Sequence, residues 1–200
     1  MLVVMAACKA HYRKQELLDA LWHCGVRLYP IFLGLEDVMK GDRAAVLKAW
    51  GKKETIQRVA KLYCAYQPDV VVLQDAHGEY GHSAHQAFSY AGRKAVSLAA
   101  GEEDDDTRWR GEFAVWRVPK VYIHLWEENQ LRLNWETPLS AFGGKTALTV
   151  ADEALHCHAS QTANGWSMAR AEEWDNSLFG LYATAVGPDV AKNDLFEHIE

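Results

Sequence analysis

The stretch that decides the fold is Pro68-Asp69-Val70-Val71-Val72-Leu73-Gln74-Asp75-Ala76-His77-Gly78-Glu79-Tyr80-Gly81-His82-Ser83-Ala84-His85. A short run of β-branched residues leads into a polar loop, and an alanine-rich helical pattern follows over residues 83–99. The eleven residues from Asp75 to His85 hold three histidines and two carboxylates. Ligands of an open α/β sheet bind outside the carboxyl ends of its strands. We therefore expect the chemistry of the chain in this loop.

The residues before this stretch alternate between strand and helix patterns. Apolar runs predict strands over residues 2–7, 26–33 (bent at Pro30) and 70–73. Helical spacing predicts helices over residues 13–24, 43–50, 54–66 and 83–99. Strands that alternate with helices predict a parallel sheet with right-handed crossovers. The expected fold is α/β, a Rossmann-like three-layer arrangement with a mostly parallel sheet.

The second half of the chain has a different texture. Strands are predicted over residues 118–125 and 130–135 and a helix over 145–161, whereas residues 175–182 give no clear pattern. Six of the eight tryptophans lie here, at positions 109, 116, 126, 135, 166 and 174. They suggest sugar-stacking platforms, but tryptophan is mostly a core residue. We predict one domain over residues 1–200, with a parallel α/β part (1–101) and a mixed C-terminal elaboration (102–200).

Composition excludes several classes of protein. A formal charge of -6 argues against a nucleic-acid partner. No apolar run approaches the ~20 residues of a membrane helix, so no membrane association is expected. The four cysteines form no C-x-x-C pair, which fits a reduced, cytoplasmic protein better than a disulfide framework. The acidic run at 102–106 is most simply a solvated loop.

His82 and His85 form half of a plausible metal site. Their three-residue spacing at a helix start places both imidazoles on one face. Gly78 and Gly81 allow the preceding loop to turn tightly. A catalytic zinc takes about three protein ligands, and this loop offers one or two, so other ligands must come from elsewhere.

Residues 68–86 resemble the second metal motif of the PIG-L (LmbE-like) family of zinc-dependent deacetylases, which remove the N-acetyl group from N-acetylglucosamine-type substrates. Other segments are similar to landmarks of the family: residues 12–16, 32–37, 119–125, 142–147 and 158–161. The resemblance implies a zinc cofactor and an N-acetylated amino-sugar substrate. It makes His85 a zinc ligand, and makes His82 the group that protonates the leaving amine or stabilises the oxyanion. Arg13 and Asp37 fall where the family holds substrate.

Two departures from the family pattern affect this expectation. Ala84 stands where the family usually has an aspartate that would orient a ligand histidine. The family's first motif, H-P-D-D, does not occur in the sequence, although it supplies two zinc ligands and the general base. The first predicted strand aligns with the family's second, so we expect the first strand and helix of the fold to be missing. That loss predicts weak catalysis by this chain alone and an exposed sheet edge. Either another polypeptide covers this edge, for example in a homo-oligomer, or the product is marginally stable.

Each candidate residue also has a structural interpretation. Arg13 and Glu16 are spaced as a surface ion pair, and Asp37 is placed to cap the helical turn that follows. His77 fits a hydrogen bond within its turn, and His158 fits a structural histidine.

Three functions therefore stay open. The first is a PIG-L-type deacetylase, or a fragment of one. The second is a non-catalytic carbohydrate-binding or scaffold protein of the same fold. The third is another metallohydrolase with a local cluster of ligands, made of Asp75, His77, His82 and His85.

Overall fold

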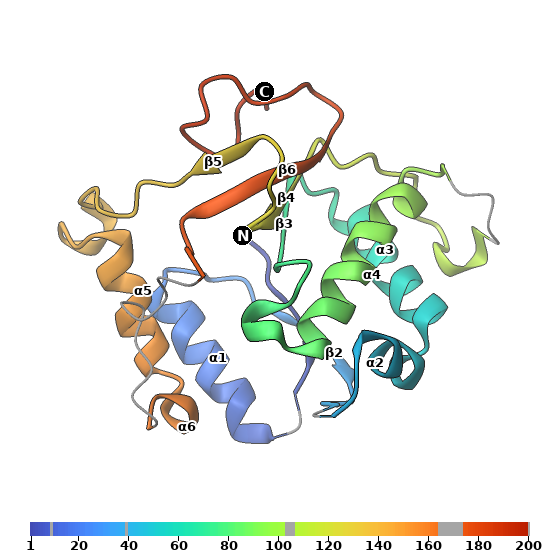
Figure 1. Cartoon of the computed structure of the whole chain (residues 1–200), viewed down its shortest axis with the longest axis horizontal. Coiled ribbons are helices and arrows are strands. Elements are labelled where there is room, and N and C mark those ends of the chain that lie inside the picture. Colours follow the sequence, from blue (N-terminus) through green and yellow to red (C-terminus); the bar gives the residue numbers. More distant parts are fainter. Residues whose placement is uncertain (9, 39, 103–106, 164–173, 200) are drawn as a thin grey trace. The chain divides into compact units, whose positions relative to one another are not determined.

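The structure is a computed structural model that describes residues 1–8, 10–38, 40–102, 107–163 and 174–199 (Figure 1). The chain forms two compact units. The first unit comprises Met1–Asp37 and Asn134–Asp175, and the second comprises Val38–Leu133 and Asn176–Glu200. The acidic residues 103–106 and Trp166 lie outside the described residues.

The first unit holds a two-stranded parallel sheet. β1 (Val4–Ala7) pairs with β2 (Ile31–Leu35), and α1 (His11–His23) connects them. Gly25 follows α1 with a φ of +77°, and a Cβ there would lie 3.3 Å from the Phe142 ring. A short 3-10 helix (Ser140–Phe142), α5 (Ala147–His156) and α6 (Ala159–Thr162) complete this unit, with α5 packed on α1.

The second unit is built on a four-stranded sheet of order β3-β4-β6-β5. The strands are β3 (Val70–Leu73), β4 (Lys120–His124), β5 (Gln130–Arg132) and β6 (Leu178–Thr184). The helices are α2 (Arg43–Trp50), α3 (Lys52–Tyr66) and α4 (Ser83–Ala99), with short 3-10 turns at Glu79–Gly81 and Thr107–Trp109. β3 and β4 are parallel, whereas β6 is antiparallel to both of its neighbours. Tyr122, Leu131 and Leu181 form a buried core on this sheet.

The α/β class is confirmed, but the sheet is less parallel than predicted. β1–β2 and β3–β4 are the parallel pairings, and β6 makes the larger sheet mixed. The antiparallel strand β6 comes from the tail, where residues 175–182 gave no pattern. The sequence of β6 neither alternates strictly nor forms a continuous buried run, so its apolar pattern did not indicate the direction of the strand.

Element boundaries agree closely in the first half and less well in the second. Residues 43–50, 70–73 and 83–99 match the predicted elements. The predicted strand over 26–33 is wrong at its start, since β2 begins at Ile31, after Pro30, which has no N–H to donate. The predicted helix over 145–161 is two helices, because the backbone at His158 leaves the helical region with a ψ of 60°.

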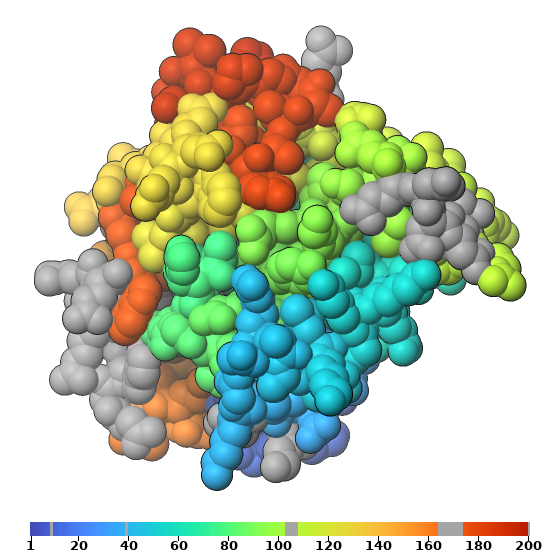
Figure 2. Space-filling model, turned by 45° about the vertical axis from the view of Figure 1, so that its right-hand side comes forward, coloured from blue at the N-terminus to red at the C-terminus, as the bar shows by residue number. Residues whose placement is uncertain are grey.

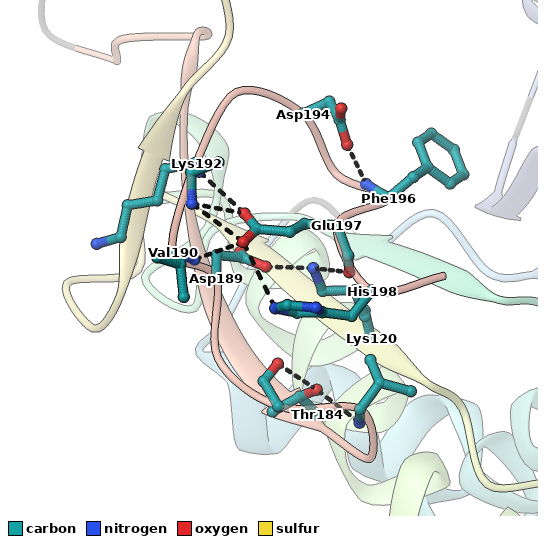
Figure 3. A network of polar contacts seen from close by, with 12 residues as sticks. Lys120, Thr184, Asp189, Val190, Lys192, Asp194, Phe196, Glu197 and His198 are labelled. Atoms are coloured by element: carbon teal, nitrogen blue, oxygen red, sulfur yellow. Dashed lines mark hydrogen bonds and ion pairs between the residues drawn. The ribbon is translucent and has the colours of Figure 1, made fainter. Parts of the chain in front are cut away.

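A buried polar network ties the C-terminal segment to β4 (Figure 3). The Lys120 ammonium is fully buried, donates to Asp189 and also donates to the Glu197 carbonyl oxygen at 2.8 Å. The Tyr122 hydroxyl donates to the other Asp189 oxygen at 2.7 Å. The Glu197 carboxylate accepts backbone N–H groups of residues 190–192, which lower its pKa to about 2. The network satisfies a charge that would otherwise be costly inside the unit.

No helix within the described ranges combines the length and apolar character that crossing a membrane requires.

Candidate functional site

The parallel strands β3 and β4 bring the loop that follows Leu73 close to His124. Leu73 lies opposite Ile123 in register, so Gln74 and Asp75 leave β3 where His124 ends β4. This is the carboxyl edge at which α/β sheets bind ligands. The loop then turns at Gly78, whose φ is +81° and where a Cβ would lie 2.5 Å from the His82 carbonyl oxygen. Only glycine fits this turn without a shift of the backbone.

Glu79 connects the loop to β4. Its Oε1 accepts the backbone N–H of Asp75 at 3.0 Å, and its two oxygens lie 2.9 and 3.0 Å from Nδ1 of His124. Burial is the largest influence on the Glu79 carboxyl and favours its neutral form. The His124 and Asp75 hydrogen bonds outweigh it, and the pKa of Glu79 is lowered. Glu79 is thus a partly buried carboxylate held by two donors.

His82 caps α4 through its side chain. Nδ1 of His82 accepts the backbone N–H of Ala84 at 3.3 Å. In the neutral ring the proton therefore sits on Nε2, which is free to donate. The rings of His82 and His85 lie edge to face, with centroids 5.2 Å apart. The predicted common face of these two histidines is confirmed in geometry.

His85 is half-buried and has a polar neighbour at one ring nitrogen. The side-chain Nε2 of Gln74 lies 3.1 Å from Nδ1 of His85, so the amide donates to Nδ1 in this arrangement. With Nδ1 as acceptor, the neutral ring carries its proton on Nε2, and metal binding through Nε2 would require the other tautomer. Burial, followed by the charge of His82, lowers the pKa of His85, against the opposing effect of Glu79. The ring is therefore biased to the neutral form that metal binding requires.

The local cluster of Asp75, His77, His82 and His85 does not form a ligand set. Asp75 is buried and accepts the backbone N–H of His77 at 3.0 Å in a tight turn, whereas the His77 ring is exposed. Across the part of the chain that the structure describes, no three His, Cys, Asp or Glu side chains are grouped to hold a metal ion. The hypothesis of a local metallohydrolase centre loses its basis.

A cavity of about 350 Å³ adjoins this loop, lined by Asp42, Arg43, Ala44, Ala76, His77 and Gln86. Figure 2 shows the blue atoms of the α2 region against the green atoms of the loop and the start of α4. The Ser83 hydroxyl donates to the Gly41 carbonyl oxygen at 2.6 Å, which joins the two segments. Four of the lining residues, Asp42, Arg43, His77 and Gln86, are polar or charged.

Within the first unit, Arg13 and Glu16 bond to Ser160, which lies in the segment 158–161 that is similar to the family. Arg13 donates to the Ser160 hydroxyl at 3.3 Å, and Glu16 accepts the N–H and O–H of Ser160 at 2.8 and 2.7 Å. Burial lowers the pKa of nearby His158, with Glu16 opposing and Arg13 reinforcing the shift. Arg13 and Glu16 therefore share Ser160 as a partner, far along the sequence, and are more than a surface ion pair with each other. Asp37 lies half-buried after β2, and Asp42 rather than Asp37 caps α2.

Sequence reasoning missed the pairing of Glu79 with His124. His124 stood within a segment similar to the family, without an assigned role, and Glu79 had no role among the candidate residues. The available signal was position, because polar residues directly follow the strand 70–73 and His124 ends the strand 120–124. That signal needs the strand order, which the sequence alone does not contain.

Comparisons with known proteins find a related family. Residues 4–96 match the profile described as PIG-L, GlcNAc-PI de-N-acetylase. Over these residues the chain is similar to the PIG-L family. The match contains Arg13, Asp37, His82 and His85.

Two curated relatives carry the same printed name, 1D-myo-inositol 2-acetamido-2-deoxy-alpha-D-glucopyranoside deacetylase. The one from Kineococcus radiotolerans is 35% identical over 86 residues, which cover 43% of this chain and 23% of the relative. The one from Mycobacterium leprae is 32% identical over 123 residues, which cover 56% of this chain and 39% of the relative. The chain thus spans well under half the length of these relatives.

A solved structure supports the fold. GalB, the 4-carboxy-2-hydroxymuconate hydratase from Pseudomonas putida KT2440, superposes with a TM-score of 0.54 and 16% identity, over 97% of this chain and 87% of that chain. At this identity the similarity concerns the fold alone.

Proposed function

We propose that this chain acts as a PIG-L-type deacetylase, or as part of one, that hydrolyses the N-acetyl group of an N-acetylglucosamine-type substrate. The observation that carries the proposal is the family match over residues 4–96, which includes the G-H-x-x-H block. The names of the curated relatives point to the same acetamido sugar class.

His82 takes the role of proton donor in this proposal. Its Nδ1 accepts a backbone N–H, so that its Nε2–H is the available donor. A donor at that position suits protonation of a leaving amine or a hydrogen bond to an oxyanion. The carboxylate of Glu79 holds the neighbouring end of β4 through His124. We assign Glu79 and His124 to the support of the site rather than to contact with substrate.

His85 takes a single metal-ligand position. A catalytic zinc needs about three protein ligands, and the residues that the structure describes contain no group of three. These residues do not fit a complete zinc site, and the sequence holds no H-P-D-D motif. Zinc dependence is therefore an expectation from the family, with one ligand assigned here.

Arg13 and Asp37 are the proposed substrate-binding residues. The Arg13 guanidinium has five N–H donors, and the Ser160 hydroxyl takes one of them. The remaining donors suit sugar hydroxyls. The proposal keeps three further expectations: a Rossmann-like three-layer arrangement, a cytoplasmic location, and possible homo-oligomers.

The second candidate is a carbohydrate-binding or scaffold protein of the same fold. It is supported by the absence, among the described residues, of three side chains grouped to hold a metal ion, because a sugar site without the metal would bind and not hydrolyse. Saturable glycan binding that a chelator leaves unchanged would distinguish this function from a metal-dependent hydrolase.

The test measures the release of a primary amine from an N-acetylglucosaminyl-inositol substrate. An amine-reactive fluorescent reagent detects the product, with and without added zinc. We expect His82→Ala to lower any activity by about 10²-fold or more, the usual weight of a general acid. His77→Ala is the matched control, since His77 lies in the same loop with its ring exposed. Sugar binding without amine release would support the second candidate, and equal effects of the two substitutions would remove the role of His82.

A further inference from the structure

Two half-buried cysteines end neighbouring helices of the first unit. Cys24 follows the last residue of α1, and Cys157 follows the last residue of α5. Both are free thiols with partial exposure, so a small oxidant can reach them. Nothing in the proposed deacetylase site uses either residue.

The contacts between α1 and α5 place these cysteines on facing sides. His23 lies 2.9 Å from Glu153, and Ser160 donates to Glu16, so the two helical segments run in opposite directions. Cys157 shares a helix face with Glu153, four residues earlier, and its thiol contacts the Glu153 carbonyl oxygen.

Cys24 faces the same way on its own helix. It follows Ala20, the buried residue of α1, by four positions, and its backbone N–H bonds to the Ala20 carbonyl oxygen at 3.0 Å. Burial raises the pKa of the Cys24 thiol, and the charge of Cys157 adds to this increase. The contact of His23, which precedes Cys24, with Glu153, one turn before Cys157, brings the two helix ends together.

The other two cysteines are excluded as partners. Cys8 precedes α1, whose 13 residues separate it from Cys24 by roughly 20 Å at 1.5 Å per residue. A disulfide needs Cα atoms within about 7 Å. Cys64 is buried in the second unit, where its thiol donates to the Ala99 carbonyl oxygen at 3.7 Å.

We propose that Cys24 and Cys157 are a redox modification site, which closes to a reversible disulfide in the presence of glutathione disulfide. One cysteine thiolate attacks glutathione disulfide, whose S–S bond breaks and releases one glutathione thiolate. The second cysteine thiolate then attacks the protein sulfur of the mixed disulfide and releases the other glutathione. In sum, two protein thiols are oxidised and one glutathione disulfide is reduced to two glutathione molecules.

The closed form would hold α5 against α1. Ser160 lies three residues after Cys157 and bonds both Arg13 and Glu16. Oxidation would therefore stabilise the surroundings of Arg13, independently of whether Arg13 binds a sugar.

The test uses the whole chain in buffers of graded reduced to oxidised glutathione, with remaining thiols alkylated before tryptic digestion. Each of the four cysteines falls in a separate tryptic peptide, so every pairing has its own mass. We expect one linked product, joining residues 15–27 to residues 146–170. Either Cys24→Ser or Cys157→Ser should abolish it, whereas Cys8→Ser and Cys64→Ala should leave it intact.

A second measurement compares the Tm of the unsubstituted chain under oxidising and reducing conditions. The unsubstituted chain should show a higher Tm when oxidised than after dithiothreitol, because the disulfide closes a long loop in the unfolded chain. Cys157→Ser should remove this difference. Exclusive glutathionylation, a linked pair with Cys8 or Cys64, or disulfide-linked dimers on a non-reducing gel would overturn the proposal.

Discussion

At the scale of single residues, the site is organised by groups that bond to backbone and to one another. Glu79 bonds to His124 and to the Asp75 amide, His82 bonds to the Ala84 amide, and Gln74 lies at His85. These short-range bonds orient three imidazoles at one strand edge. Buried polar groups of this kind are stable only when each has its partner, because an unpaired one keeps its full desolvation cost.

Replacement of Glu79 by glutamine tests this carboxylate. Hydrogen bonds to charged groups contribute about 1.5–3 kcal/mol, and we expect Glu79→Gln to lower the free energy of unfolding by about that amount at pH 7. The folded pKa of Glu79 is lowered from the ordinary value of 4.5. Its stabilisation is therefore present above pH 4.5 and is lost as the pH falls through the folded pKa. Urea unfolding at several pH values measures both effects.

Glu102→Gln is the control for that measurement. Glu102 pairs with Arg117 on the surface, with 46% of its side chain exposed. Surface pairs contribute about 0–1 kcal/mol, so the control should change stability little. If both variants behave alike, or if the Glu79→Gln deficit persists at low pH, the buried carboxylate does not act as described.

At the scale of elements, turns between strands and helices decide where the side chains point. The β3–α4 connection uses Gly78 and Gly81 at positive φ, with Tyr80 also left-handed at 59°. α4 then begins at Ser83 and carries His85 in its first turn. A loop so constrained places His82 and His85 reproducibly.

Two glycine substitutions separate backbone strain from steric clash. A Cβ at Gly78 would lie 2.5 Å from the His82 carbonyl oxygen, whereas a Cβ at Gly81 would have no heavy atom within 4 Å. Both have positive φ, which costs an L-residue about 1–2 kcal/mol. We expect Gly81→Ala to cost about that much and Gly78→Ala to cost more, with shifted His82 resonances in NMR spectra. Equal costs with unchanged spectra would contradict the role of Gly78.

At the scale of the whole molecule, each unit has its own stabilising contacts. In the second unit, β6 returns from the tail to lie between β4 and β5, and the C-terminal segment closes over Lys120. In the first unit, α1 is joined to α5 and α6 by His23, Glu16 and Arg13. Segments distant in sequence thus complete both units.

The buried Lys120–Asp189 pair supplies a test at this scale. Removal of one member of a buried pair costs about 3–5 kcal/mol, because the other charge is left without a partner. We expect Asp189→Asn to destabilise the second unit by this order and to speed hydrogen exchange in residues 189–199. The double variant Lys120→Met/Asp189→Leu should cost less than the sum of its single changes. Arg117→Ala, at an exposed pair, is the control.

The sequence by itself determined the local elements, the loop after residue 73, the common face of His82 and His85, and the resemblance to the PIG-L family. Periodicity, turn residues and motifs depend on neighbours in the chain, so they can be read in order. Only the tertiary structure decided the strand order, the antiparallel β6, the bond of Glu79 to His124 and the contact of Arg13 with Ser160. These depend on side chains far apart in sequence, whose approach is set by packing and not by local preference.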